Sequence, residues 1–106
     1  MNRQTITDDE GIPGGWFDRD KATTYAEGTD HDGSNFISKA TGSQWEHEYL
    51  YHTKKGKWIL HHWSQWQGST ERWTIISPSD AAAWLIRNDR DVEAAGLGKQ
   101  AGEQEV

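Results

Sequence analysis

Apolar and aromatic positions are concentrated in the middle of the chain. Residues 45–53 (WEHEYLYHT) and 57–66 (KWILHHWSQW) are aromatic runs of strand length, and KKGK between them is typical of a tight turn. Residues 36–40 and 72–77 (RWTIIS) form shorter apolar runs bounded by turn-forming residues. This pattern predicts about four β-strands in sequence.

A helix is predicted directly after the last of these strands. Ser77 is a good N-cap, Pro78 suits the first helical position, and Asp80 stands where a capping-box acid belongs. One face of this helix carries Ala81, Trp84, Leu85 and Asn88. We expect that face to cover the sheet.

The order of these elements predicts an α+β fold: a single antiparallel meander of about four strands with a C-terminal helix packed on one face. We expect a disordered lead-in over residues 1–14, one domain over 15–95 and a flexible tail over 96–106. Within the domain, residues 18–27 (DRDKATTYAE) are expected to form a short helix capped by Asp18.

The register of the central hairpin decides which side chains share a face. A two-residue loop at Lys55-Gly56 places Tyr49, Tyr51, Trp58 and Leu60 together on the buried face and leaves the other face mixed. A three-residue loop shifts the register and rearranges these pairs. His61 and His62 alternate to opposite faces in either case.

Composition makes the core depend on aromatic residues. The chain of 106 residues is 33% hydrophobic and contains seven Trp, three Tyr and two Phe, but no Cys. The absence of Cys excludes disulfides and thiolate metal sites and favours a cytoplasmic protein, and no apolar run is long enough to span a membrane.

The net charge of −6 belongs to the flanks of the chain. Residues 36–77 hold five Lys or Arg against three Asp or Glu, whereas residues 1–35 hold three against eight. The acidic total argues against general polyanion binding, although it leaves room for a local basic site in the middle segment.

Motifs for metal or catalytic chemistry are weak. HEYLYH (residues 47–52) is one residue too long for a zinc-binding HExxH helix, and a metal cluster of Glu48, His52 and His61 is less favoured than ordinary surface histidines. A metal-independent ribonuclease would need a base, an acid and a cation, for which Glu48, His61 and Arg72 are candidates. We expect no cofactor, no metal and no catalysis.

The stronger hypothesis is a ligand-binding platform. Lysines at the hairpin turn, beside tryptophans and amides, combine charge for phosphates with ring faces for base stacking. The candidate ligand-binding residues are Lys54, Lys55, Lys57, His61, Trp63, Gln65, Trp66 and Gln67. The alternative is that the tryptophans are core: Trp58 and Trp84 are better explained so, while Trp63 and Trp66 are open.

Two resemblances add to this interpretation. The runs ATGSQWEHEYLYHTKKGKWILHHWSQWQGS and IISPSDAAAWLIRN resemble small uncharacterised bacterial proteins that share a TGSQ–HE–LY–T–G–W–L–WSQWQG pattern, which implies no activity. The hairpin with its KGK turn, a strand and a Ser-Pro-started helix is similar to the whirly-type single-stranded DNA-binding transcriptional coactivators. That resemblance implies a homodimer and contacts from Lys54, Lys55, Lys57 and Trp63, whereas the acidic flanks depart from it.

We therefore expect a small homodimeric binding or regulatory module, with single-stranded or unpaired nucleic acid as the leading ligand. The alternatives are a protein partner, as for an antitoxin, an inhibitor or a mobile-element component, and the small ribonuclease. No membrane association is expected.

Overall fold

The computed structural model describes residues 1–7, 13–66 and 71–106, and β-strands are the main regular structure among them. Six strands form one sheet in the order β2-β1-β8-β7-β6-β3, and a separate pair joins β4 to β5. The strands are β1 (Arg3–Thr7), β2 (Pro13–Asp18), β3 (Thr23–Ala26), β4 (Thr29–His31), β5 (Phe36–Ser38), β6 (Glu46–His52), β7 (Trp58–Ser64) and β8 (Arg72–Ile76). Three helical segments complete the fold: the 3-10 turn η1 (Arg19–Lys21), α1 (Pro78–Arg87) and α2 (Gly98–Glu103).

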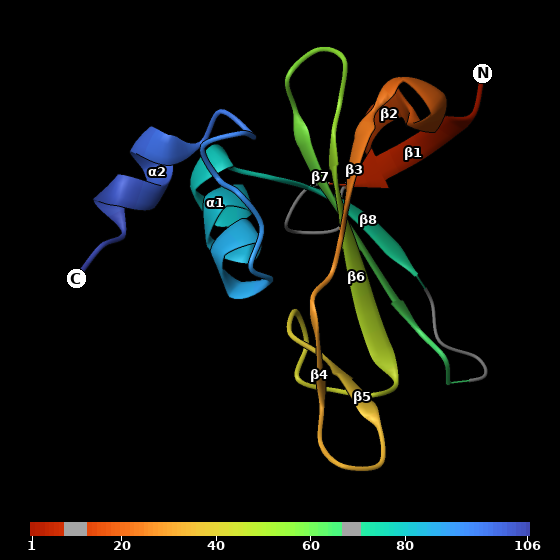
Figure 1. Ribbon diagram of the computed structural model, residues 1–106. Coiled ribbons are helices and arrows are strands. Elements are labelled where there is room, and N and C mark those ends of the chain that lie inside the picture. The colour runs from red at the N-terminus through yellow and green to blue at the C-terminus, as the bar shows by residue number, and fades with distance from the viewer. Residues whose placement is uncertain (8–12, 67–70) are drawn as a thin grey trace.

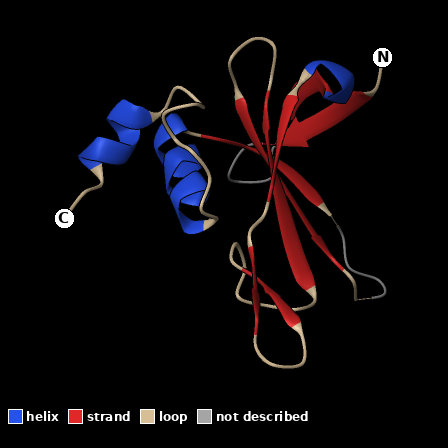
Figure 2. Cartoon of the chain, viewed as in Figure 1, coloured by secondary structure: helices blue, strands red, loops and turns tan. Residues whose placement is uncertain are grey.

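The large sheet is mixed and curls into a half-barrel (Figure 1). All its neighbouring strands are antiparallel except β1 and β8, which run parallel and pair through Thr7 and Thr74. Both helices lie on one side of the sheet, and β1 and β2 curl toward the other side (Figure 2). No described helix is both long and apolar enough to cross a membrane.

The predicted α+β fold with a four-stranded antiparallel meander is therefore wrong. The sheet has six strands, one pairing is parallel, and a second small sheet is present. The strands that the sequence pattern missed, β1, β2, β3 and β4, are short and rich in Thr, Gly and charged residues, so they carry little apolar alternation. Their position comes from pairing with the sheet, which a single-strand pattern does not record.

The two faces of the sheet carry separate cores. On the helix-side face, Leu50 and Trp58 pack with Ala81, Trp84 and Leu85 of α1. On the opposite face, which we call the β2-side face, Ile6 of β1 and Phe17 of β2 pack on three sheet residues: Tyr51, Ile59 and Trp73. Because both faces are covered, β7 begins with three consecutive apolar residues, Trp58-Ile59-Leu60, instead of an alternating pattern.

The hairpin register differs by one residue from the two-residue-loop prediction. Leu50 pairs with Leu60, Tyr49 with His61 and Tyr51 with Ile59, because the loop contains three residues, 54–56. Tyr49 and Tyr51 therefore lie on the β2-side face, whereas Trp58 and Leu60 lie on the helix-side face. The predicted single face of these four residues is wrong, while the alternation of His61 and His62 to opposite faces is confirmed.

Helix α1 forms as its sequence predicts. The Ser77 side chain accepts a hydrogen bond from the backbone N–H of Asp80, Pro78 occupies the first turn, and the predicted face of Ala81, Trp84, Leu85 and Asn88 is buried. Asn88 also ties the helix end to the β3–β4 connection, since its Oδ1 accepts from the Gly28 N–H. A Cβ on Gly28 would lie 2.9 Å from the Asn88 carbonyl oxygen, so this close approach requires glycine.

Three segments differ from their sequence-based expectation. Strand β1 lies inside the predicted lead-in of residues 1–14, and helix α2 lies inside the predicted tail of residues 96–106. The predicted helix over residues 18–27 is wrong: Asp18 caps only the three-residue turn η1, after which β3 pairs with β6. The β-branched pair Thr23-Thr24 suits this strand better than a helix.

Candidate functional site: a lysine-rimmed pocket

The hairpin tip between β6 and β7 holds three lysines in a defined turn. Thr53 fixes the turn: its N–H donates to the Lys57 carbonyl, its carbonyl accepts from the Gly56 N–H, and its Oγ1 accepts from the Lys57 N–H. Gly56 has φ 85°, a left-handed conformation that favours glycine. Lys54, Lys55 and Lys57 are consequently exposed on a rigid turn.

A pocket of about 520 Å³ opens between this tip and strand β2 on the β2-side face. Its apolar wall is formed by Ile6, Trp16, Phe17 and Ile59. Its rim carries the three tip lysines together with Lys21 from η1. The pocket therefore combines an apolar, aromatic interior with four cationic side chains at its edge.

Trp16 is the aromatic side chain that the pocket presents to solvent. It is 51% exposed, whereas Phe17 beside it is buried in the core. The Arg3 guanidinium lies 4.4 Å from the centroid of the Trp16 ring, so a cation–π contact restrains the indole. An exposed and restrained indole can stack on a planar ligand group at a small entropic cost.

Among the residues that the structure describes, Asp18 is the acid that lines the pocket, and its carboxylate accepts hydrogen bonds from backbone donors. Its Oδ1 accepts from the N–H groups of Asn2 and Asp20. The hydrogen bond from Asn2 lowers the pKa of Asp18, so this carboxylate stays ionised while it holds the start of β1 against η1. Counted over the described residues, the pocket lining has a net positive charge, because it holds four lysines against one carboxylate.

Of the predicted binding residues, His61 and Trp63 lie on the β2-side face but not in this pocket. His61 is buried, stacks on Trp73 at 3.6 Å between ring centroids, and shares a 2.8 Å hydrogen bond with Glu71. Burial lowers the pKa of His61, with Glu71 acting in the opposite direction. Trp63 is half-buried beside His47 and Tyr49. Neither side chain is free to serve as an open stacking platform.

Gln65 and Trp66 lie at the other end of the hairpin. Trp66 is 60% exposed and contacts Trp45, which is 43% exposed, with ring centroids 5.1 Å apart. The seven residues of β7 separate them from the lysines by about 20 Å, given about 3.3 Å per residue. Gln67 lies outside the described residues. The predicted set therefore divides into a lysine end and a tryptophan end and does not form one site.

Neither predicted chemical cluster assembles. The side chains of Glu48 and His52 lie on the helix-side face, whereas that of His61 lies on the β2-side face. These three residues therefore cannot bind one metal ion together. Within residues 1–7, 13–66 and 71–106, no group of three His, Asp or Glu side chains is arranged to hold a metal. The proposed ribonuclease set of Glu48, His61 and Arg72 is split by the same alternation.

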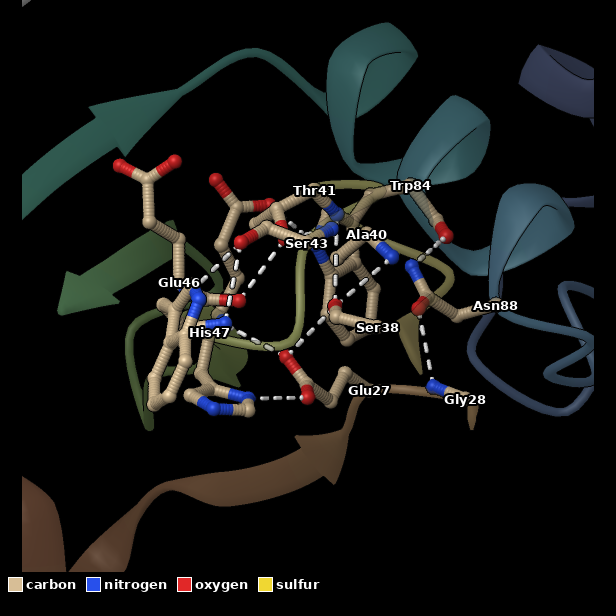
Figure 3. Close-up of polar contacts among 12 residues, drawn as sticks. Glu27, Gly28, Ser38, Ala40, Thr41, Ser43, Glu46, His47, Trp84 and Asn88 are labelled. Atoms are coloured by element: carbon tan, nitrogen blue, oxygen red, sulfur yellow. Dashed lines mark hydrogen bonds and ion pairs between the residues drawn. The ribbon is translucent and has the colours of Figure 1, made fainter. Parts of the chain in front are cut away.

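A largely buried carboxylate joins the β3–β4 connection to strands β5 and β6 near the tryptophan end of the hairpin. Glu27 accepts hydrogen bonds from the Ser38 hydroxyl at 2.9 Å and from the Glu48 N–H at 2.7 Å, and it contacts His47 Nδ1 at 2.7 Å (Figure 3). All these contacts are with other residues of the protein. The network therefore holds β5 and the β3–β4 connection against β6. We assign it a structural role.

Sequence reasoning identified the three tip lysines but missed Trp16, Phe17 and Lys21, which complete the pocket. The signal was present in WFDRDK, where aromatic and cationic residues adjoin. It was hidden because η1 and β2 reach the hairpin only through the curl of the sheet. Comparison with known proteins found no matching family model, no matching curated protein and no matching solved structure.

Proposed function

We propose that this protein binds single-stranded or otherwise unpaired nucleic acid at the lysine-rimmed pocket. The observation that carries the proposal is the union of four lysines with an exposed, restrained indole around one apolar cavity. In this arrangement, backbone phosphates contact the lysines and one base stacks on Trp16 in the pocket. Duplex DNA offers no unstacked base to such a cavity.

The charge distribution sets the expected strength of binding. The whole chain carries −6, so its long-range field opposes a polyanion and only the local lysine cluster attracts one. We therefore expect dissociation constants of roughly 1–100 μM, the range of sequence-independent nucleic-acid contacts, and a marked loss of affinity with salt.

The test is fluorescence anisotropy of a labelled single-stranded DNA of about 12 nucleotides, within the site sizes of single-strand binding proteins. The double variant Lys54→Ala/Lys55→Ala is expected to weaken binding at least tenfold. The matched control Arg87→Ala/Lys99→Ala removes the same charge from the two helices, and it should bind as the wild type does. Equal losses in both double variants would show that net charge, and not this pocket, governs binding.

Trp16→Ala and Trp66→Ala form a second matched pair. Both remove an exposed indole, but only Trp16 lines the pocket. Trp16→Ala should lower the affinity by roughly 1–3 kcal/mol, the usual contribution of one stacked base, whereas Trp66→Ala should leave it unchanged. The reverse result would move the binding site to the tryptophan end.

A protein partner is a second candidate function, favoured by the Trp45–Trp66 pair. Two adjacent indoles, 43% and 60% exposed, are of the kind that anchors protein interfaces. This function predicts a complex that survives nuclease treatment and is lost in Trp66→Ala. A nuclease-resistant complex that is unaffected by Trp66→Ala would exclude these indoles as its anchor.

A further inference from the structure

The three-residue hairpin loop places an acid–base set in one row across the helix-side face. Glu48 of β6 pairs with His62 of β7, and His62 pairs with Arg72 of β8. Side chains in one cross-strand row lie about 5 Å apart at their Cβ atoms. Relative to a two-residue loop, the register is shifted by one residue, so His62 and not His61 lies in the row with Glu48 and Arg72. This row brings a carboxylate, an imidazole and a guanidinium together.

His62 is held in one orientation through Glu48. The Trp84 indole N–H of α1 donates to Glu48 Oε1 at 3.0 Å, and Glu48 Oε2 lies 2.9 Å from His62 Nδ1. The Glu48 side chain is only 12% exposed and that of His62 is 19% exposed. A largely buried carboxylate that is fixed by a second element and bound to Nδ1 orients the imidazole ring.

The other imidazole nitrogen of His62 faces an exposed carboxylate. Nε2 of His62 lies 3.4 Å from Oε1 of Glu46, whose side chain is 49% exposed. Glu46 is therefore accessible to an incoming hydroxyl, and Nε2–H is accessible to a leaving oxygen. Arg72 is exposed on the adjacent strand and provides the positive charge.

We propose that Glu46, His62 and Arg72 form a site that cleaves RNA by transesterification. Glu46 removes the proton of a 2′-hydroxyl, and the 2′ oxygen bonds to phosphorus as the P–O5′ bond breaks. The 5′ oxygen leaves with the proton of His62 Nε2, while Arg72 neutralises the non-bridging phosphate oxygens. Proton transfer from Glu46 to Nε2 restores both groups, so the step needs no metal and no co-reactant.

RNA is the substrate class because it supplies its own nucleophile. The products are a 2′,3′-cyclic phosphate and a 5′-hydroxyl, and DNA, which lacks the 2′-hydroxyl, is not cleaved. The inference takes nucleic acid from the proposed function, but its residues lie on the opposite face of the hairpin from the pocket. Binding at the pocket and cleavage at this row are therefore separately measurable, and this activity goes beyond the non-catalytic module that the sequence suggested.

The experiment follows a labelled single-stranded RNA and the DNA of the same sequence with identically purified proteins. Wild type is expected to produce cyclic-phosphate ends from RNA alone. His62→Asn should reduce the rate at least 100-fold, in the range of general acid catalysis, and so should Glu46→Gln. The matched control His52→Asn changes the same residue type on the same sheet face, where His52 stacks on Trp58, and should keep the wild-type rate.

Glu48→Gln separates positioning from folding. The variant keeps the side-chain shape but replaces the carboxylate oxygen that contacts His62 Nδ1, so kcat for RNA cleavage should fall while KM stays at the wild-type value. Thermal unfolding of each variant checks that the fold is retained. An unchanged kcat in a folded Glu48→Gln protein would contradict the role given to Glu48.

The outcomes distinguish this inference from the proposed binding function. If the RNA stays intact while single-stranded DNA is bound, the cleavage site is overturned and the binding pocket is retained. RNA cleavage that persists in His62→Asn overturns the site and indicates a contaminating nuclease. RNA cleavage that is lost in His62→Asn, with no DNA bound at low salt, supports this site and overturns the pocket.

Discussion

At the scale of single residues, the environment of His61 shows how one position can mislead a sequence-based assignment. In the sequence it stands among tryptophans and amides as a candidate ligand group. In the structure it is a core residue, stacked on Trp73 and closed on its outer side by Glu71. Its neighbour His62 is the more accessible of the two, and no feature of the dipeptide itself distinguishes them.

His61 predicts a pH dependence of stability. Burial lowers its pKa in the folded state, so the unfolded chain takes up a proton at a higher pH than the folded chain does. The free energy of unfolding contributed by this residue should therefore fall as the pH drops below about 6.5, the ordinary value for histidine.

Urea unfolding of wild type and His61→Gln at pH 7.5 and 5.0 measures this contribution. Between pH 7.5 and pH 5.0, the wild type should lose more unfolding free energy than His61→Gln does. A difference that does not change with pH would mean that His61 titrates alike in the folded and unfolded chains.

At the scale of elements, local signals were sufficient where the chain ends or begins an element and insufficient where strands must find partners. The cap of α1 and its buried face were predicted from Ser77 to Asn88, because a helix satisfies its hydrogen bonds within its own segment. Strands β6, β7 and β8 were predicted from their aromatic and apolar content. The edge strands β2 and β3 and the parallel β1–β8 contact were not, since their stability depends on neighbours distant in sequence.

The N-cap of α1 gives a direct stability prediction. Ser77→Ala removes the side-chain acceptor of the Asp80 N–H and should cost about 1 kcal/mol of unfolding free energy. The control Ser79→Ala lies inside the first turn and should change stability by less than about 0.5 kcal/mol. Chemical denaturation measures both, and equal effects would argue against a specific cap.

The hairpin turn gives a second stability prediction at this scale. Gly56→Ala places a side chain at φ 85° and should destabilise the protein by about 1–2 kcal/mol, although a Cβ there meets no other atom within 4 Å. Gly102→Ala is the matched control, because it also meets nothing within 4 Å but lies in α2 without a left-handed φ. It should be neutral or slightly stabilising. Melting temperatures of the two variants test whether backbone conformation is the cause.

At the scale of the whole molecule, charge is divided along the central hairpin. The lysine tip and the pocket stand at one end, while Glu27, Glu46 and Glu48 gather toward the other. The net charge of −6 hides this division, and so does the local composition of the hairpin. Sequence reasoning identified the lysines and expected aromatic residues beside them. It placed the lysine end and the tryptophan end of the hairpin in one site, although the fold separates them.

The salt dependence of single-strand binding tests the central claim most directly. Each phosphate contact made by a lysine contributes about −0.7 to the slope of log affinity against log salt concentration for a single strand. Lys54→Ala/Lys55→Ala should therefore have a slope shallower than that of wild type by about 1.4, and Arg87→Ala/Lys99→Ala should keep the wild-type slope. Identical slopes for all three proteins, or no binding by wild type at low salt, would contradict the account.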